Sequence, residues 1–215
     1  MTLSLDLNAM EPQLRYKLLT AVVIPRPVAW VTTLGPTGVV NAAPYSFFNL
    51  FGQDPAIVVL GLEHRPDGSP KDTTANIRRT GEFVVNIATP ALTESMVGTA
   101  AAYASDVSEP EALGLATAPS AHVAPPRLAD APAAIECRRL TTLQFSPERD
   151  IVIGQAVGLA TADGLIDTDA WRVRWDAVGD GDYPVARLFA DRYARLDEIA
   201  PMAIPAVPKT KGETR

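Results

Sequence analysis

Short β-rich segments joined by tight turns are the feature that most constrains the fold of this chain. Residues 28–34 are rich in β-branched and aromatic side chains, which are typical of a strand. A Gly-Pro-Thr-Gly turn at residues 35–38 leads into a returning strand over residues 39–43. Further strands are predicted over residues 56–62, 82–88, 133–145, 150–161, 171–175 and 183–188. Because turns rather than helices join most of these segments, the sequence predicts a mainly antiparallel β-barrel and not a doubly wound parallel sheet.

Helices are predicted at three places between the strands. Residues 11–20 begin with Glu-Pro, residues 90–104 are rich in alanine, and a third helix ends at Gly81. The side chain of Asp72 or Thr73 is expected to cap the start of this third helix.

Two later segments contain residues, an acidic group and a pair of tryptophans, for which a functional role can be considered. The stretch 105–131 reads as a loop with one short helical turn, and we expect its acidic side chains to form a solvated face. These side chains are Asp106, Glu109 and Glu111. Trp171 and Trp175 are four residues apart, which in a strand places both on one face, in packing or in a subunit contact.

Composition excludes several classes of function. The net charge is −6 and no basic run is present, which argues against a nucleic-acid partner. The lone Cys137 can form no intrachain disulfide, and with two histidines it offers too few ligands for a zinc site. No apolar run is long enough to span a bilayer and no signal peptide is visible, so a cytoplasmic protein without membrane contact is expected.

The length of the chain fits one domain. Of the 215 residues, 47% are hydrophobic, which is ample for one core, and residues 1–200 are expected to form a single domain. Residues 201–215 are rich in Pro and Lys and are expected to form a mobile tail.

The stretch Arg65–Gly81 predicts an anion site. Its first part is a loop interrupted by Pro and Gly, and its second part is the short helix described above. Lys71, Thr73 and Thr74 therefore fall at a helix start, where free backbone N–H groups and the helix dipole favour a phosphate. The alternative is a solvated loop that happens to contain these residues. Neither a Gly-x-Gly-x-x-Gly turn nor a Walker loop is present to hold a phosphate in another way.

Five motifs in order resemble a known family. They are Arg26-Pro-Val-Ala-Trp-Val-Thr-Thr33, Asn41-Ala-Ala-Pro-Tyr-Ser-Phe-Phe-Asn49, Asp54-Pro55, Lys71-Asp-Thr-Thr-Ala-Asn-Ile77 and Glu82-Phe-Val-Val-Asn86. Together they resemble the flavin reductase-like family of FMN-binding split barrels, over about residues 14–195. The resemblance implies a six-stranded Greek-key antiparallel barrel that pairs into a homodimer, with one FMN in each subunit near the interface.

The same resemblance implies a set of cofactor-binding residues. The residues placed along the cofactor are Arg26, Pro27, Val28, Ala29 and Thr32. Those placed near the isoalloxazine and the ribityl chain are Tyr45, Ser46, Phe47, Phe48 and Asn49. Those placed at the phosphate end are Lys71, Asp72, Thr73 and Asn76. The family's later arginine–glycine–glycine pattern is altered here to Arg187-Leu-Phe-Ala-Asp-Arg-Tyr193, which leaves the second-subunit side of the pocket and the substrate open.

Several of these residues keep a structural alternative. Trp30 and the aromatic residues of the stretch 45–51 would suit either a wall for the flavin ring or the protein core. Arg26 would suit either an anion contact or an ion pair. His64 would suit either the mouth of the pocket or an exposed loop.

The function implied is an FMN-dependent oxidoreductase, an NAD(P)H:flavin reductase that passes electrons to a monooxygenase, a metal centre or dioxygen. The flavin carries hydride transfer, so no catalytic side chain and no metal ligand are expected. Two alternatives remain open, namely a non-catalytic flavin carrier on the same fold and a cofactor-free β-barrel interaction protein. The choice between NADH and NADPH, and between a resident and a turned-over flavin, is also open.

Overall fold

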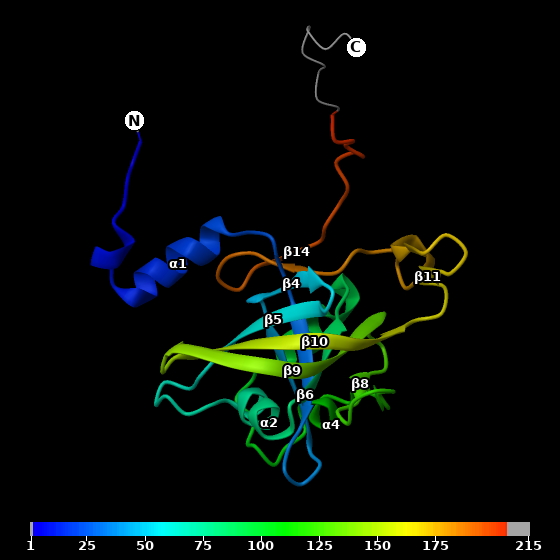
Figure 1. Ribbon diagram of the computed structural model, residues 1–215, viewed down its shortest axis with the longest axis horizontal. Helices are drawn as coiled ribbons and strands as arrows, with labels where there is room; N and C mark the ends of the chain where they lie inside the picture. Colours follow the sequence, from blue (N-terminus) through cyan, green and yellow to red (C-terminus); the bar gives the residue numbers. More distant parts are fainter. Residues whose placement is uncertain (1, 206–215) are drawn as a thin grey trace, which may run out of the picture.

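Seven antiparallel strands form one hydrogen-bonded sheet in the computed structural model, which describes residues 2–205 (Figure 1). Their order is β3-β2-β6-β9-β10-β5-β4. The strands are β2 (Ala29–Leu34), β3 (Val40–Tyr45), β4 (Phe48–Gln53), β5 (Ala56–Glu63), β6 (Glu82–Ile87), β9 (Ala133–Ser146) and β10 (Arg149–Thr161). Most of the expected tail, residues 206–215, lies outside the described part of the chain.

The sheet closes on itself through the stretch that contains β3 and β4. Only Ser46 and Phe47 separate these two strands, yet β3 pairs with β2 and β4 pairs with β5. The stretch 40–53 therefore joins both edges of the sheet, and the ring counts six strands. The chain returns after β5 to place β6 beside β2, which is the spatial order of a Greek key. The prediction of a mainly β, six-stranded antiparallel Greek-key barrel is confirmed.

Short elements surround this barrel. The helical ones are η1 (Leu7–Ala9), α1 (Pro12–Val22), α2 (Asp72–Thr80), η2 (Pro90–Leu92), α3 (Thr93–Gly98), α4 (Glu109–Ala112) and η3 (Trp175–Ala177). The short strands are β1 (Arg26–Pro27), β7 (Thr117–Ala118), β8 (Arg127–Leu128), β11 (Ile166–Asp167), β12 (Arg172–Val173), β13 (Ala186–Arg187) and β14 (Tyr193–Ala194). Figure 1 shows α1 standing off to one side, while α2 and α4 lie near one end of the barrel. Within residues 2–205, no helix is long and apolar enough to cross a membrane.

Side chains around β2 alternate between two apolar clusters, one on each face of the sheet. Ala29 and Val31 point into the barrel, where they join a fully buried cluster that includes Phe83. Val28 and Trp30 point to the other face and pack in a second cluster. The indole N–H of Trp30 donates to Thr99 Oγ1 at 3.0 Å, so Trp30 is a satisfied core residue.

Two sequence expectations differ from the structure. The helix expected over 90–104 ends at Gly98, because Thr99 Oγ1 donates to the Met96 carbonyl at 2.7 Å and is itself held by the Trp30 indole. Trp171 and Trp175 do not share a face of one strand. Trp171 has a positive φ of 50°, and Trp175 begins the short helix η3.

Candidate functional site

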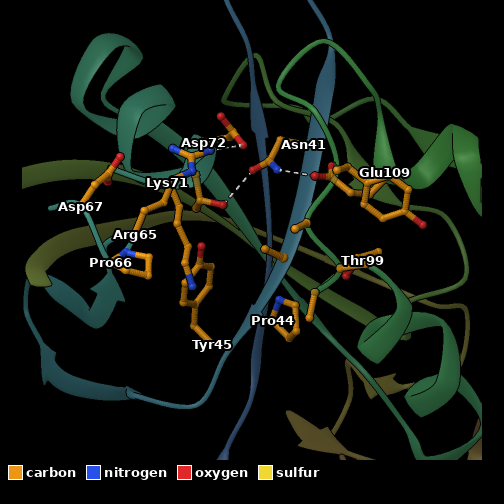
Figure 2. A pocket seen from close by; sticks show the side chains of 16 residues that line it. Asn41, Pro44, Tyr45, Arg65, Pro66, Asp67, Lys71, Asp72, Thr99 and Glu109 are labelled. Carbon is orange, nitrogen blue, oxygen red and sulfur yellow. Dashed lines mark hydrogen bonds and ion pairs between the residues drawn. The ribbon is translucent and has the colours of Figure 1, made fainter. Parts of the chain in front are cut away.

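A cavity of about 560 Å³ opens at the start of α2. Figure 2 shows its walls, with Asn41 lying between α2 and Glu109. β3 supplies Asn41 and Tyr45, the loop before α2 supplies Arg65 and Lys71, and α2 itself supplies Thr73. The short stretch 99–103 after α3 and Glu109 of α4 complete the lining.

The start of α2 fits an anion. Lys71 is the N-cap and makes no side-chain cap hydrogen bond, so the first backbone N–H groups of the helix lack the usual side-chain partner. The Thr74 hydroxyl in the first turn is 1% exposed and has no hydrogen-bond partner within the described part of the chain. Free N–H groups at a nine-residue helix, next to a buried unpaired hydroxyl, are the donors that a phosphate group needs.

The cap of α2 differs from the one expected. Asp72 is the first residue of the helix and Thr73 the second, and neither is the cap. The Asp72 carboxylate instead pairs with Arg65 at 3.0 Å, which holds the preceding loop against the helix. Gly81 ends α2 at a φ of 72°, as predicted.

The charges around the cavity are mixed. Lys71 Nζ lies 3.2 Å from Glu63 Oε2, and both side chains are about half exposed, so this pair can open to a ligand. Burial raises the pKa of the Tyr45 hydroxyl to about 12, which keeps it protonated. Burial also raises the pKa of Glu109, although hydrogen bonds from Ala42 and Asn41 oppose this shift.

Thr73 and Asn76 both belong to a buried polar network, although Thr73 also lines the first cavity. Thr73 Oγ1 donates to Asn41 Oδ1 at 2.7 Å, and Asn76 Nδ2 donates to Thr33 Oγ1 at 3.0 Å. Asn41 Oδ1 also accepts from Thr33 Oγ1 at 3.1 Å. Asn76 lines a smaller cavity of about 230 Å³ that lies behind this network. The network therefore fixes the α2 start against β2 and β3.

A second large cavity, of about 600 Å³, lies along the aromatic stretch. Its lining includes these predicted cofactor residues: Arg26, Pro27, Ser46, Phe47, Phe48 and Asn49. Val23, just after α1, and Phe51 of β4 complete an apolar wall. Phe47 packs under the Arg149 guanidinium, which lies 4.5 Å from the ring centre. Tyr45 in the first cavity and Ser46 in the second are neighbours in sequence, although the two cavities share no lining residue.

Arg26 acts as an anchor in the structure. Its guanidinium donates to the carbonyl oxygens of Thr20 at 2.5 Å, Val23 at 2.8 Å and Leu188 at 2.7 Å. These bonds join α1, β1 and the β13–β14 hairpin. With its donors engaged in this way, Arg26 positions the wall of the second cavity.

The structure thus brings the predicted residues together only in part. Tyr45, Lys71, Asp72 and Thr73 line the first cavity, and six others line the second. Val28, Ala29 and Thr32 are buried in the barrel wall, where the Thr32 hydroxyl donates to the Pro126 carbonyl.

Two residues differ from their expected environment. Glu109, predicted to be solvated, is only 6% exposed, because its carboxylate accepts hydrogen bonds from Asn41 and Ala42 of β3. No local signal distinguishes it from Glu111, which is exposed. His64 is buried and not in an exposed loop. Its Nε2 lies 3.3 Å from Asp150, and it lines a third cavity that shares Arg65 with the first.

Comparisons with known proteins agree with this architecture. The model of the family described as flavin reductase like domain matches residues 21–172. The crystal structure of 2-nitrobenzoate 2-nitroreductase from Pseudomonas fluorescens is 34% identical, covers 98% of this chain and all of its own, and has a TM-score of 0.85. Nitrilotriacetate monooxygenase component B from Bacillus cereus is 31% identical over 94% of this chain and 99% of its own, with a TM-score of 0.86.

A third structure bears on the fold alone. A split barrel domain protein from Shewanella frigidimarina is 22% identical over 93% of this chain and 96% of its own, with a TM-score of 0.77. The barrel described above is therefore a split barrel.

Proposed function

The chain belongs to the flavin reductase-like domain family, and on this premise we propose that it binds FMN and reduces flavin with electrons from NADH or NADPH. The observation that carries the proposal is the start of α2, where the uncapped N–H groups and Lys71 lie beside the first cavity and the buried Thr74 hydroxyl of the first turn has no partner within the described residues. A phosphate-bearing ligand in this cavity would give the N–H groups and Lys71 a partner.

The two cavities have the character that the two ends of FMN require. The first cavity would hold the phosphate end, with Lys71 and the α2 backbone as its partners. The aromatic stretch would shelter the ring, since Tyr45 lines the first cavity and Ser46, Phe47, Phe48 and Asn49 line the apolar second one. The ring's polar edge would find partners in Ser46 and Asn49.

Chemistry at this site needs little from side chains. Bound flavin accepts a hydride and releases electrons, and the protein supplies position and the exclusion of water. The protonated Tyr45 is suited to hydrogen bonding at the ligand and not to acid–base work, because its pKa of about 12 lies far from neutral pH.

We also propose a homodimer, in which a second copy covers the apolar face around α1. Val22 is 77% exposed, Phe51 is 69% exposed and Leu50 is 62% exposed. Val23 and Phe51 line the open side of the second cavity, so a second copy would complete its wall.

Two acceptor classes follow from the neighbours. The Bacillus cereus protein is a component of a monooxygenase, which supports a partner oxygenase as acceptor. The Pseudomonas fluorescens protein is a nitroreductase, which supports a small nitroaromatic acceptor. Steady-state oxidation of NADH and NADPH, with and without added FMN and with a nitrobenzoate, separates these classes. No turnover with either nicotinamide would overturn the reductase and leave a flavin carrier.

Lys71→Ala tests the phosphate contact. The variant removes one charge-assisted hydrogen bond, about 1.5–3 kcal/mol, so FMN affinity should fall by roughly ten- to a hundredfold. Riboflavin, which has no phosphate, should bind both proteins equally. Lys17→Ala on the exposed face of α1 is the matched control. Equal FMN affinity in Lys71→Ala and the native protein would contradict the assigned contact.

A further inference from the structure

The guanidinium of Arg149 lies over the ring of Phe47 at one side of the second cavity. Its Cζ atom is 4.5 Å from the ring centre, and both residues line that cavity. Gly61 of β5 leaves room for this pair, because an added Cβ there would lie 2.9 Å from Phe47 Cβ and 3.6 Å from Arg149 Cδ. The Gly61 N–H also donates to the Phe47 carbonyl at 2.7 Å. Strand β5 therefore supports a cation that is stacked on an aromatic ring in the cavity wall.

The donors of Arg149 are only loosely engaged within the described residues. Its Nη1 donates to the Gly61 carbonyl at 3.4 Å, and its Nη2 lies 4.0 Å from a carboxylate oxygen of Glu63. Glu63 has a nearer partner in Lys71, at 3.2 Å. Charge-assisted hydrogen bonds are usually about 2.7–2.9 Å long, so both contacts of Arg149 are weak. A guanidinium carries several N–H donors, and Arg149 therefore keeps donors for a ligand.

The other polar groups of the second cavity have partners or roles already. Arg26 directs its guanidinium at three carbonyl oxygens. Ser46 and Asn49 are assigned above to the polar edge of the flavin ring. Much of the remaining lining is apolar and includes Val23, Phe47, Phe48, Phe51 and Ile151. Arg149 is therefore left to recognise a charge on a second ligand in this cavity.

A small molecule that exchanges a hydride with the flavin has to touch its ring, with about 3–3.5 Å between the reacting atoms. With the ring along the aromatic stretch, that molecule shares the second cavity with it. The walls then offer it flat aromatic faces and one loosely held guanidinium. Aromatic faces favour a flat ligand, and the planar fork of an arginine matches a planar carboxylate through two parallel hydrogen bonds.

We infer that the second cavity takes a small aromatic carboxylate beside the flavin ring, and that Arg149 is the residue that selects its negative charge. The inference rests on the proposed function and names the class of small molecule that meets the ring. The carboxylate serves binding alone and takes no part in electron transfer. A ligand with several phosphates fits less well, because the cavity lining holds two arginines and Arg26 is already engaged.

Benzoate and benzamide are the matched probes, because they share size and shape and differ in charge. Isothermal titration calorimetry measures their binding to the flavin-free protein, and the change in flavin absorbance measures it for the FMN-loaded protein. The native protein should bind benzoate about tenfold more tightly than benzamide, since the contact with a guanidinium that is 24% exposed is charge-assisted but partly screened. Acetate, which lacks the aromatic ring, should compete weakly with benzoate.

Variants at position 149 assign this preference to the guanidinium. Arg149→Met and Arg149→Gln both remove the charge, so the ratio of benzoate to benzamide affinity should fall to near one in each. Arg149→Lys keeps the charge without the planar fork and should restore part of the preference. Arg139→Met is the matched control, because Arg139 is exposed on β9 and does not line the second cavity. Circular dichroism melting curves establish that each variant is folded, and either folded neutral variant decides the test.

Three outcomes would overturn the inference. The first is a native ratio near one, and the second is a native-like ratio in a folded neutral variant. The third is a higher KM for NADH or a weaker affinity for FMN in the neutral variants with the benzoate preference intact, which would assign Arg149 to the electron donor or to the flavin. A native protein that binds no flavin would refute the proposed function instead, and calorimetry on the flavin-free protein would still show whether Arg149 selects a carboxylate.

Discussion

Replacing the buried guanidinium of Arg26 should destabilise the protein more than replacing any solvated arginine. We choose Arg26→Met, which keeps the length and apolar stem of the side chain but donates no hydrogen bond. The carbonyl oxygens of Thr20, Val23 and Leu188 would each lose a charged donor. These three carbonyls lie in α1, in the segment that follows it and beside β13, so the loss affects three segments at once.

The magnitude follows from the number of bonds and from burial. A net contribution of about 1–1.5 kcal/mol for each of the three bonds gives a loss of about 3–4.5 kcal/mol in the free energy of unfolding. Water cannot readily replace the guanidinium, since Arg26 is only 9% exposed. Such a loss is a large share of the stability of an ordinary domain, about 5–15 kcal/mol.

Urea unfolding followed by circular dichroism measures this loss. Arg174→Met is the control, because Arg174 pairs only with Asp176 within the described residues and both side chains are more than half exposed. Backbone hydrogen exchange should locate the effect in α1 and the β13–β14 hairpin. A loss below about 1 kcal/mol, or one equal to that of the control, would refute the view of Arg26 as an anchor.

Three further substitutions or measurements test the barrel. Asp150→Asn should lower the free energy of unfolding, measured with urea, by about 2–3 kcal/mol, because Arg78 donates to both oxygens of this fully buried carboxylate at 2.8 Å. The loss stays moderate because the partly exposed Arg78 regains contact with water. An unchanged urea midpoint would contradict this prediction. Gly154→Ala should lower the melting temperature, since the added Cβ would lie 2.7 Å from Cζ of the fully buried Phe83. Such overpacking costs about 1–3 kcal/mol. An unchanged melting temperature would show that Phe83 moves aside without loss of stability. Cys137, whose pKa burial raises to about 12, should react with a thiol reagent only after unfolding, and rapid labelling of the native protein would be inconsistent with its burial.

The barrel could be predicted from the sequence because the patterns that indicate its strands and turns are local. β-branched runs, the turn at residues 35–38 and the left-handed Gly81 each depend on a few neighbouring residues. Once six strands follow one another with short turns, few closed antiparallel arrangements remain. The motifs that resemble the family then fixed the order of the strands.

The site was harder to predict because its contacts join residues that are distant in sequence. Glu109 looks like one acid in a solvated loop, yet its partner Ala42 is 67 positions away. Arg26 contacts a carbonyl that is 162 positions away, and no local pattern distinguishes that role from an anion contact. Burial of a charged residue is decided by tertiary packing, which a single sequence does not display.

The visible spectrum of the protein reconstituted with FMN and passed through gel filtration tests the central claim most directly. We predict that the protein retains a yellow flavin band, and that NADH or NADPH bleaches this band in the absence of oxygen. A colourless protein after reconstitution would contradict the assignment of the α2 cavity as a flavin site.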